Sequence, residues 1–463
     1  MNAQGAASGT ERVLWAGAAV TDLTPAASVF LFGYPHVPRM STGVHDRLEC
    51  AALYLREEAG GAAIFLANDL IFAGRELARD VRRRIAAATG VPAAAIMVTA
   101  THTHSGPVTV DYVSNGADAI VPRADPAYLR FVEERMVEAA LRAVQRAEPA
   151  EIGLAVAEAA GVGTNRHDPA GPADPEVPVL VARSRATRAP LACMVVYAMH
   201  PTVLHEDSTL ISGDFPHFTR RFLQAGPLPA DCPVLYHNGA SGNQSPRHVT
   251  KANTFAEAER LGELLGRSIA GVLPGIKYLS GVRVSGRVEE LELQPREFPG
   301  VAAVVAAERA ARELFERLRR EGAPRPLVRT AECDWFGAEE TAELARAAAD
   351  GRLAAAVRRC LPAELQVIAI GPWRFVGWPG EYFVEYALAV RAQSPQTFVI
   401  TMANGELQGY IVTAEAAARG VYEATNAVFR PENGPRVVAA TLALLQRCHE
   451  PPSAAPAGGK PAV

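Results

Sequence analysis

The segment from Thr99 to Pro107 holds the pair of side chains with the clearest chemical potential. Its sequence is Thr-Ala-Thr-His-Thr-His-Ser-Gly-Pro, so His102 and His104 stand two residues apart after an apolar run at 93–98. The run is typical of a buried strand, and in an extended backbone residues i and i+2 point to one face. We therefore expect both imidazoles to project together. They could bind a metal cation, or one could bind it while the other moves protons. Two hydrogen-bonded histidines at a strand end are the alternative.

Three further polar side chains follow predicted strands in a similar way. His200 ends the apolar run 195–199, Glu381 follows a Trp-Pro-Gly turn, and Tyr410 comes after an apolar run at 398–402. Active-site groups are commonly placed where a rigid strand meets a loop. Taken singly, a structural histidine, a surface glutamate and a core tyrosine are the more ordinary interpretations.

Short polar segments offer additional groups. The loop at 237–247 contains Ser245, and Arg166 carries a guanidinium that could bind a developing oxyanion. Asp214 could cap a following helix. Asp69 ends a predicted strand and could orient a metal-binding histidine by accepting its second N–H. An ordinary turn and a surface arginine remain alternatives for the first two.

Strand-like and helix-like segments alternate along the chain, which predicts an α/β fold with mixed parallel and antiparallel sheets packed with helices. The predicted strands are Ala62–Ala67, Ala93–Thr99, Ile152–Ala157, Val177–Ala182, Leu191–Met199, Val234–Tyr236, Val282–Leu293, Leu365–Ile370, Arg374–Gly377 and Phe398–Met402. The predicted helices are Glu76–Thr89, Pro126–Glu148, Thr254–Val272, Val301–Arg320, Glu339–Cys360 and 435–448.

The same pattern predicts a single large domain over residues 12–449. Residues 1–11 and 450–463 are small, polar or proline-rich, so we expect them to be disordered. Residues from about 295 to 360 include Ala/Arg/Glu-rich helices with few candidate catalytic groups. We expect part of this segment to be a lateral helical insert.

Composition excludes several classes of protein. The chain has 463 residues, 49% of them hydrophobic, and a net charge of -4 without the basic excess of a nucleic-acid-binding protein. It contains no apolar run of about 18 residues, so no stable membrane insertion is expected. The start lacks a signal-peptide pattern, and the six cysteines are scattered, which together predict a cytoplasmic protein with reduced thiols. The sequence leaves open whether it forms a homo-oligomer.

Taken together, eleven segments resemble the catalytic domain of the neutral (non-lysosomal) ceramidase family, a zinc-dependent amidase. In chain order they are Val20-Thr-Asp-Leu-Thr-Pro25, Phe32-Gly-Tyr-Pro35, Gly43-Val-His-Asp46, Asn68-Asp69, Thr101-His-Thr-His-Ser-Gly-Pro107, Asn165-Arg166, His200, Ser212-Gly-Asp214, Gly242-Asn-Gln-Ser-Pro246, Pro379-Gly-Glu381 and Gly409-Tyr-Ile-Val-Thr413. The resemblance spans residues 12–426, and its His-Thr-His-Ser-Gly-Pro motif is the most specific.

The resemblance implies one zinc ion per chain. The family's ligands, two histidines, a glutamate and a tyrosine, correspond to His102, His200, Glu381 and Tyr410. The second histidine of the motif, His104, corresponds to the group that acts as acid and base.

Three other family residues also have counterparts. Arg166 would line the site, and Tyr422, in a Tyr-Glu pair twelve residues after the ligand tyrosine, would help to hold the oxyanion. Ser245 corresponds to a serine proposed in the family as a nucleophile. An amine leaving group needs an acid and zinc-activated water already supplies a nucleophile, so we favour attack by water.

Four departures bear on the substrate. Val108-Thr109 replaces the family's Gly-Gly, and Arg247 replaces an asparagine. The sequence also shows neither the family's immunoglobulin-like C-terminal domain nor a secretory signal. We therefore predict hydrolysis of a linear amide in a small or amphipathic N-acyl substrate. The alternatives are a zinc-dependent ester or lactone hydrolase of specialised metabolism, a true ceramidase acting on N-acylsphingosine, and a non-catalytic binding protein.

Overall fold

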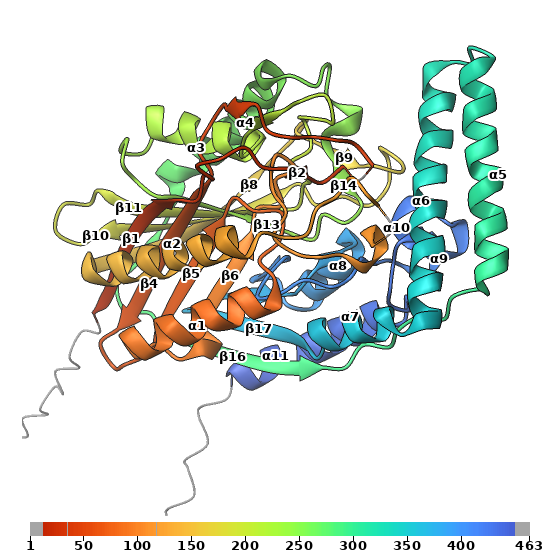
Figure 1. The fold of residues 1–463 in the computed structure, drawn as a ribbon. Coiled ribbons are helices and arrows are strands. Elements are labelled where there is room, and N and C mark those ends of the chain that lie inside the picture. The colour runs from red at the N-terminus through yellow and green to blue at the C-terminus, as the bar shows by residue number, and fades with distance from the viewer. Residues whose placement is uncertain (1–12, 35, 117, 450–463) are drawn as a thin grey trace, which may run out of the picture.

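A nine-stranded sheet forms the centre of the molecule in the computed structural model, which describes residues 13–34, 36–116 and 118–449 (Figure 1). Eight strands follow the order β13-β11-β10-β8-β1-β4-β5-β6, and β15 pairs with β8. The pairs β5–β6 and β11–β13 are parallel, and the others are antiparallel. The strands are β1 Leu14–Asp22, β4 Glu49–Glu57, β5 Ala62–Asn68, β6 Ile96–Ala100, β8 Glu148–Glu158, β10 Glu176–Ser184, β11 Pro190–Tyr197, β13 Val234–Asn238 and β15 Tyr278–Leu279.

Helices cover this sheet. The helix α2 (Pro126–Gln145) packs on β1, β4 and β5, and α1 (Arg75–Thr89) packs beside α2 and β6 (Figure 1). The helices α3 (Phe215–Ala225) and α4 (Phe255–Val272) form a pair, and α4 also packs on β8. The helix α1 buries Ala78, Val81 and Ile85, which follow the spacing of one helical face.

A second, four-stranded sheet packs on the first. Its order is β16-β17-β18-β20, with only β18–β20 parallel. Phe65 of the first sheet and Phe375 of the second meet edge to face, with ring centroids 5.6 Å apart. The elements are β16 Val284–Leu291, β17 Ala363–Ile370, β18 Trp373–Gly377 and β20 Thr397–Ile400, with α8 Val384–Gln393 and α11 Asn433–His449 beside them.

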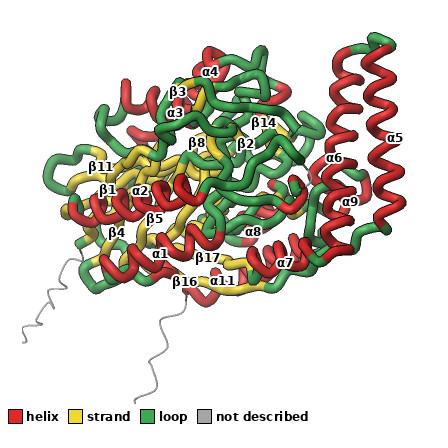
Figure 2. Tube along the Cα trace, in the orientation of Figure 1, coloured by secondary structure: helices red, strands yellow, loops and turns green. Residues whose placement is uncertain are grey.

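Two long helices form a hairpin that projects from one side of the molecule (Figures 1 and 2). They are α5 (Val301–Arg320) and α6 (Arg325–Asp350), and α7 (Arg352–Cys360) leads back to the second sheet. The helix α6 packs against the short helix α10 (Tyr422–Thr425). The hairpin therefore reaches the segment that carries Tyr422.

Short elements connect these layers. They are β2 Leu31–Phe32, β3 Gly43–Val44, β7 Gly106–Pro107, β9 Thr164–Asn165, β12 Leu210–Ile211, β14 Gln244–Ser245, β19 Glu381–Tyr382, β21 Tyr410–Ile411, α9 Ala414–Arg419, and the single turns η1 Ala93–Ala95, η2 Val113–Asn115, η3 Pro246–His248 and η4 Leu273–Gly275. Among the described residues, none of the helices combines the length and apolar character needed to cross a bilayer.

The predicted fold class is confirmed: the chain mixes parallel and antiparallel sheets with helices. Several element boundaries were wrong. Residues 93–95 form a turn before β6, and the segment predicted as one helix over 339–360 is the end of α6 followed by α7. The break comes at Gly351, which has a φ of +86° and ends α6 in a left-handed conformation. The predicted disordered ends, 1–11 and 450–463, lie outside the described residues.

Candidate active site

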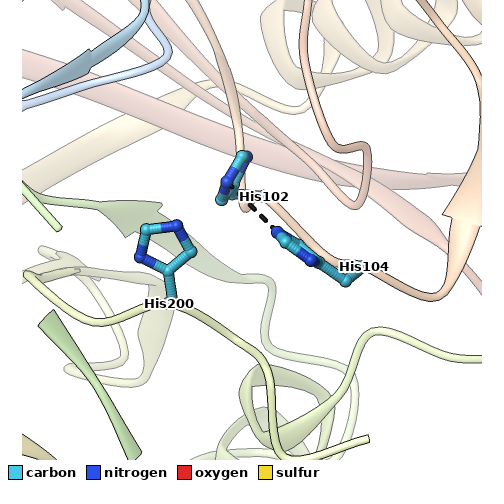
Figure 3. A group of neighbouring side chains, drawn as sticks. All are labelled: His102, His104 and His200. Carbon is cyan, nitrogen blue, oxygen red and sulfur yellow. Dashed lines mark hydrogen bonds between the residues drawn. The ribbon is translucent and has the colours of Figure 1, made fainter. Parts of the chain in front are cut away.

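Three histidines converge where strands of the main sheet end. His102 and His104 follow β6, and His200 follows β11 (Figure 3). One ring nitrogen from each lies within 4.8 Å of those of the other two. The Nε2 atoms of His102 and His104 are 3.3 Å apart, and the rings of His102 and His200 have centroids 4.9 Å apart. The structure therefore brings all three sequence-predicted histidines together.

The local backbone at His102 differs from the extended strand that we expected. β6 ends at Ala100, and His102 has a φ of +70°, in the left-handed region that non-glycine residues seldom adopt. Its backbone N–H donates to the carbonyl of Leu70 and its ring Nδ1 lies 2.8 Å from that of Ile71. These bonds hold the ring, so the prediction from strand alternation was wrong although the two imidazoles do converge.

Hydrogen bonds to carbonyl groups fix the orientation of both buried imidazoles. Nδ1 of His102 faces the Ile71 carbonyl, and Nδ1 of His200 lies 2.7 Å from the carbonyl oxygen of Ser241 and 3.0 Å from that of Gln244. A carbonyl can only accept, so each Nδ1 carries the hydrogen. In the neutral rings, both Nε2 atoms then present lone pairs toward the centre of the cluster.

Glu381 completes this centre. Its Oε2 lies 3.3 Å from Nε2 of His102 and 3.1 Å from Nε2 of His200. Burial opposes its ionisation, but a positive charge held at the two histidines keeps the pKa of this carboxyl well below its usual range. Two nitrogen lone pairs and a carboxylate thus meet in a buried space. This donor set fits a bound cation, and nitrogen and oxygen ligands of this kind suit zinc.

Tyr410 lies beside Glu381 in a two-residue parallel pair, β19 with β21, in which the two residues are direct partners. The Arg166 guanidinium lies over the phenol ring, with its Cζ 5.5 Å from the ring centroid. Burial raises the pKa of Tyr410 well above its usual value, and the nearby guanidinium acts in the opposite direction. The structure therefore places the fourth predicted ligand and Arg166 at the same centre.

Glu423 holds the Arg166 guanidinium. Nε of Arg166 donates to one carboxylate oxygen of Glu423, and Nε2 of His167 lies 2.8 Å from the other. Although burial opposes ionisation, Arg166 lowers the pKa of Glu423 to about 2. Within the described residues, Nη2 of Arg166 is buried without a hydrogen-bond partner. It is a donor that remains available near Tyr410.

His104 is held from two sides. The ring of Tyr34 meets its imidazole edge-on, with centroids 5.3 Å apart, and Nη1 of Arg39 donates to its carbonyl oxygen. Burial, followed by the neighbouring histidines, places the pKa of His104 well below its usual value. Its Nδ1 has no partner in the described part of the chain. The ring is therefore neutral and able to accept a proton.

Tyr422 and Ser245 occupy different surroundings. Tyr422 lines the cavity beside the histidines, but its hydroxyl lies 3.4 Å from Oε1 of Glu340. The hydroxyl of Ser245 accepts from the backbone N–H of Arg247 and caps η3, and Ser245 does not line that cavity.

Two expectations about aspartates have opposite outcomes. Asp214 caps α3, as predicted, by accepting from the N–H of Phe215. Asp69 does not orient a histidine, because the Ile71 carbonyl occupies that position. Instead, its carboxylate pairs with the guanidinium of Arg220. Because both groups are buried, each charge needs the other as its counter-ion.

A cavity of about 70 Å³ opens beside the histidine cluster. Among its lining residues, the polar groups Tyr112, Glu340 and Asn426 were not sequence-predicted candidates. They belong to no motif, and only the packing of α6 against α10 and η2 brings them to the site. A second cavity of about 290 Å³ shares Tyr112 and is lined by charged groups that include Asp118 and Arg123.

Comparisons with known proteins show which family this chain resembles. Residues 15–218 match the family described as neutral/alkaline non-lysosomal ceramidase, N-terminal. A curated protein from Mycobacterium tuberculosis (strain ATCC 25618 / H37Rv), named neutral ceramidase, is 27% identical over 228 residues, which cover 44% of this chain. The match spans about a third of that relative's length (34%).

Two solved structures share the fold. The crystal structure of neutral ceramidase from Pseudomonas aeruginosa has a TM-score of 0.71 and 18% identity, and covers 95% of this chain and 75% of that one. A structure titled "Ceramidase complexed with C2" has the same TM-score and identity, with 94% and 76% covered. Together with the matching motifs, these findings confirm the predicted resemblance to the neutral/alkaline non-lysosomal ceramidase family, whose N-terminal model matches residues 15–218.

Proposed function

We propose that this protein is a zinc-dependent amidohydrolase that cleaves a linear N-acyl bond of a small or amphipathic substrate. The observation that carries the proposal is the meeting of the two Nε2 lone pairs of His102 and His200 with the carboxylate of Glu381. Three hydrogen-bond acceptors in a buried space repel one another unless a cation or proton lies between them. The family's named members are amide hydrolases, which supports this chemistry.

Four residues would hold one zinc ion: His102, His200, Glu381 and Tyr410. The carbonyl groups behind both Nδ1 atoms would keep the histidines in the ligating tautomer. When bound, zinc supplies a Lewis acid that polarises an acyl carbonyl and acidifies water.

The other residues would move protons and stabilise charge. His104 would take a proton at Nε2 from the attacking water as the new C–O bond forms. It would return a proton to the amide nitrogen as the C–N bond breaks, so that a carboxylic acid and an amine leave. Arg166, through its unpartnered Nη2, would stabilise the oxyanion, and Tyr422 would assist once its hydroxyl leaves Glu340.

The surroundings of the cluster favour a substrate of modest size. The adjoining cavity has about 70 Å³, and the larger cavity beside it mixes charged side chains such as Arg123 with apolar ones such as Val110. A true ceramidase is the second candidate, favoured by the names of the relatives. Comparing kcat/KM for short N-acyl amines with that for detergent-dispersed ceramide separates the two. Higher efficiency on ceramide would overturn the preference proposed here.

The decisive experiment measures metal content and amide hydrolysis in parallel. Purified protein is reconstituted with zinc, analysed by elemental analysis and incubated with short N-acyl amines, with and without a chelator. We expect one zinc per chain and activity that the chelator removes. Protein that hydrolyses amides without zinc would contradict the proposal, as would zinc-loaded protein that hydrolyses none.

Variants of the histidines separate ligands from the acid/base group. His102→Ala should lose zinc, whereas His104→Ala should keep it and lose about 10²–10⁴-fold in turnover. His45→Ala, at an exposed position, is the matched control. His104 also lies within the three-histidine cluster, so loss of zinc from His104→Ala would assign it as a ligand instead.

A further inference from the structure

The projecting helix hairpin contributes a buried acid to the wall of the cavity. Glu340 lies on α6, is 3% exposed, and lines the same cavity as His102, Glu381 and Tyr410. Asn426, which follows α10, lines the cavity beside it. The hairpin is therefore part of the site and not only a lateral addition.

A hydrogen bond sets the direction of the Asn426 amide. Its Nδ2 donates to Oε2 of Glu340 at 2.8 Å, so the carboxylate determines which end of the amide faces α6. The amide oxygen Oδ1 is then left buried and without a partner among the described residues, although Asn426 is only 8% exposed. The hydroxyl of Tyr112, on the same cavity, is also buried and unpartnered there.

The Asn426 Oδ1 is thus an unsatisfied acceptor at the cavity wall, whereas the Tyr112 hydroxyl beside it can both donate and accept. The other carboxylate oxygen of Glu340 has only the Tyr422 hydroxyl nearby, at the long distance of 3.4 Å. A buried polar group without a partner is energetically unfavourable, because it has lost its hydrogen bonds to water. Proteins retain such groups mainly where a ligand satisfies them. A wall rich in acceptors selects a ligand that donates hydrogen bonds.

We propose that Glu340 and Asn426 form a specificity subsite that binds a hydrogen-bond-donating group of the substrate, a hydroxyl or an ammonium, close to the scissile amide. The proposal rests on the proposed amidase function. The donor would bond to the Asn426 Oδ1 and to the Glu340 carboxylate. The Tyr422 hydroxyl would then lose its partner and become free to face the reacting carbonyl.

Three amides that share one acyl chain test the subsite. Their amine halves are ethanolamine, ethylenediamine and propylamine, which end in a hydroxyl, an ammonium and a methyl group. We expect the hydroxyl or the ammonium amide to exceed the propyl amide by about tenfold or more in kcat/KM, because the alkyl group leaves the acceptors unpaired. Comparing kcat/KM for the hydroxyl amide with kcat/KM for the ammonium amide identifies which donor the site prefers.

The variants Glu340→Ala and Asn426→Ala should remove this preference, so that the three amides have about equal kcat/KM. Glu313→Gln, at an exposed position of α5 in the same hairpin, should keep it. Melting curves verify folding, and Asn426→Ser provides a second variant if Asn426→Ala does not fold. A uniform loss on all three amides would show that Glu340 only positions its neighbours and would overturn the subsite.

Calorimetric binding of the same amides separates the two proposals. Hydrolysis of all three without a preference would overturn the subsite and leave the amidase intact. Preferential binding of a donor-bearing amide without any hydrolysis would support the subsite and contradict the amidase. Equal binding of all three without hydrolysis would overturn both.

Discussion

Glu381 and Tyr410 are direct partners in the parallel pair of β19 and β21. Two motifs that are separate in the sequence thus present a carboxylate and a phenol at one point, next to Nε2 of His102 and His200. The turn before Glu381 contains Gly380, with a φ of +75°, which a glycine adopts without strain. Because the two short strands support each other, the pair of candidate ligands is held as a unit.

Glu381→Gln should abolish zinc binding without destabilising the metal-free protein. The amide keeps the shape of the side chain, and its NH₂ can donate to a histidine Nε2 that otherwise meets a carboxylate. We expect zinc content to fall and amide hydrolysis to drop at least about 10²-fold, with an unchanged melting temperature in chelator. Glu415→Gln, at an exposed position of α9, is the control. Stoichiometric zinc in the Glu381 variant would remove this residue from the ligand set.

Gly33→Ala should impair catalysis by displacing His104. A Cβ at Gly33 would lie 2.5 Å from Cγ of the His104 ring, and the φ of +121° is unfavourable for alanine. Gly60→Ala separates the two effects, because Gly60 has a φ of +108° and no atom within 4 Å of the added carbon. Both variants should lose stability in urea denaturation, but only Gly33→Ala should lose most of its kcat. Equal activities of the two would mean that His104 is not needed in its present position.

For residues that lie in motifs, the sequence was enough to predict which side chains meet. His102, His200, Glu381 and Tyr410 each follow a strand or turn with recognisable residues, and the structure brings them together. The strand alternation assumed for His102 was nevertheless wrong, because the hydrogen bonds to Leu70 and Ile71, which are remote in sequence, set its backbone.

Other parts could not be predicted because tertiary packing determines them. Strands β1 and β4 are central to the main sheet, yet their runs of alanine have little strand propensity and no clear alternation, since both faces are buried. Glu340 looks like any helical glutamate in the sequence. Only the contact of α6 with α10 buries it beside Asn426.

Ser245→Ala should retain measurable amide hydrolysis. The Ser245 hydroxyl caps η3 and does not line the cavity beside the histidines, so its removal should cost about 0.5–2 kcal/mol of stability. Intact-mass spectrometry during turnover should show no acyl group on the protein. A mass increase equal to the acyl group, absent in the alanine variant, would assign the serine as the nucleophile.

Glu340→Gln should stabilise the protein increasingly as the pH rises from 5 to 8. Burial raises the pKa of Glu340 to about 7 from a usual value of 4.5; the nearby carboxylates of Glu339 and Asp118 add to the shift, and hydrogen bonds from Asn426 and Tyr422 oppose it.

The sign follows from proton binding. Between pH 4.5 and 7 the folded protein binds more protons at this carboxyl than the unfolded chain, so the free energy of unfolding of the wild type falls as the pH rises. Above pH 7 the loss reaches about 3 kcal/mol. Glutamine does not titrate and still accepts from Asn426. The variant should therefore match the wild type near pH 4.5 in urea denaturation and exceed it by up to that amount at pH 8.5, whereas Glu313→Gln should show no such trend. A difference that stays constant with pH would mean that Glu340 is ionised in the folded protein throughout this range.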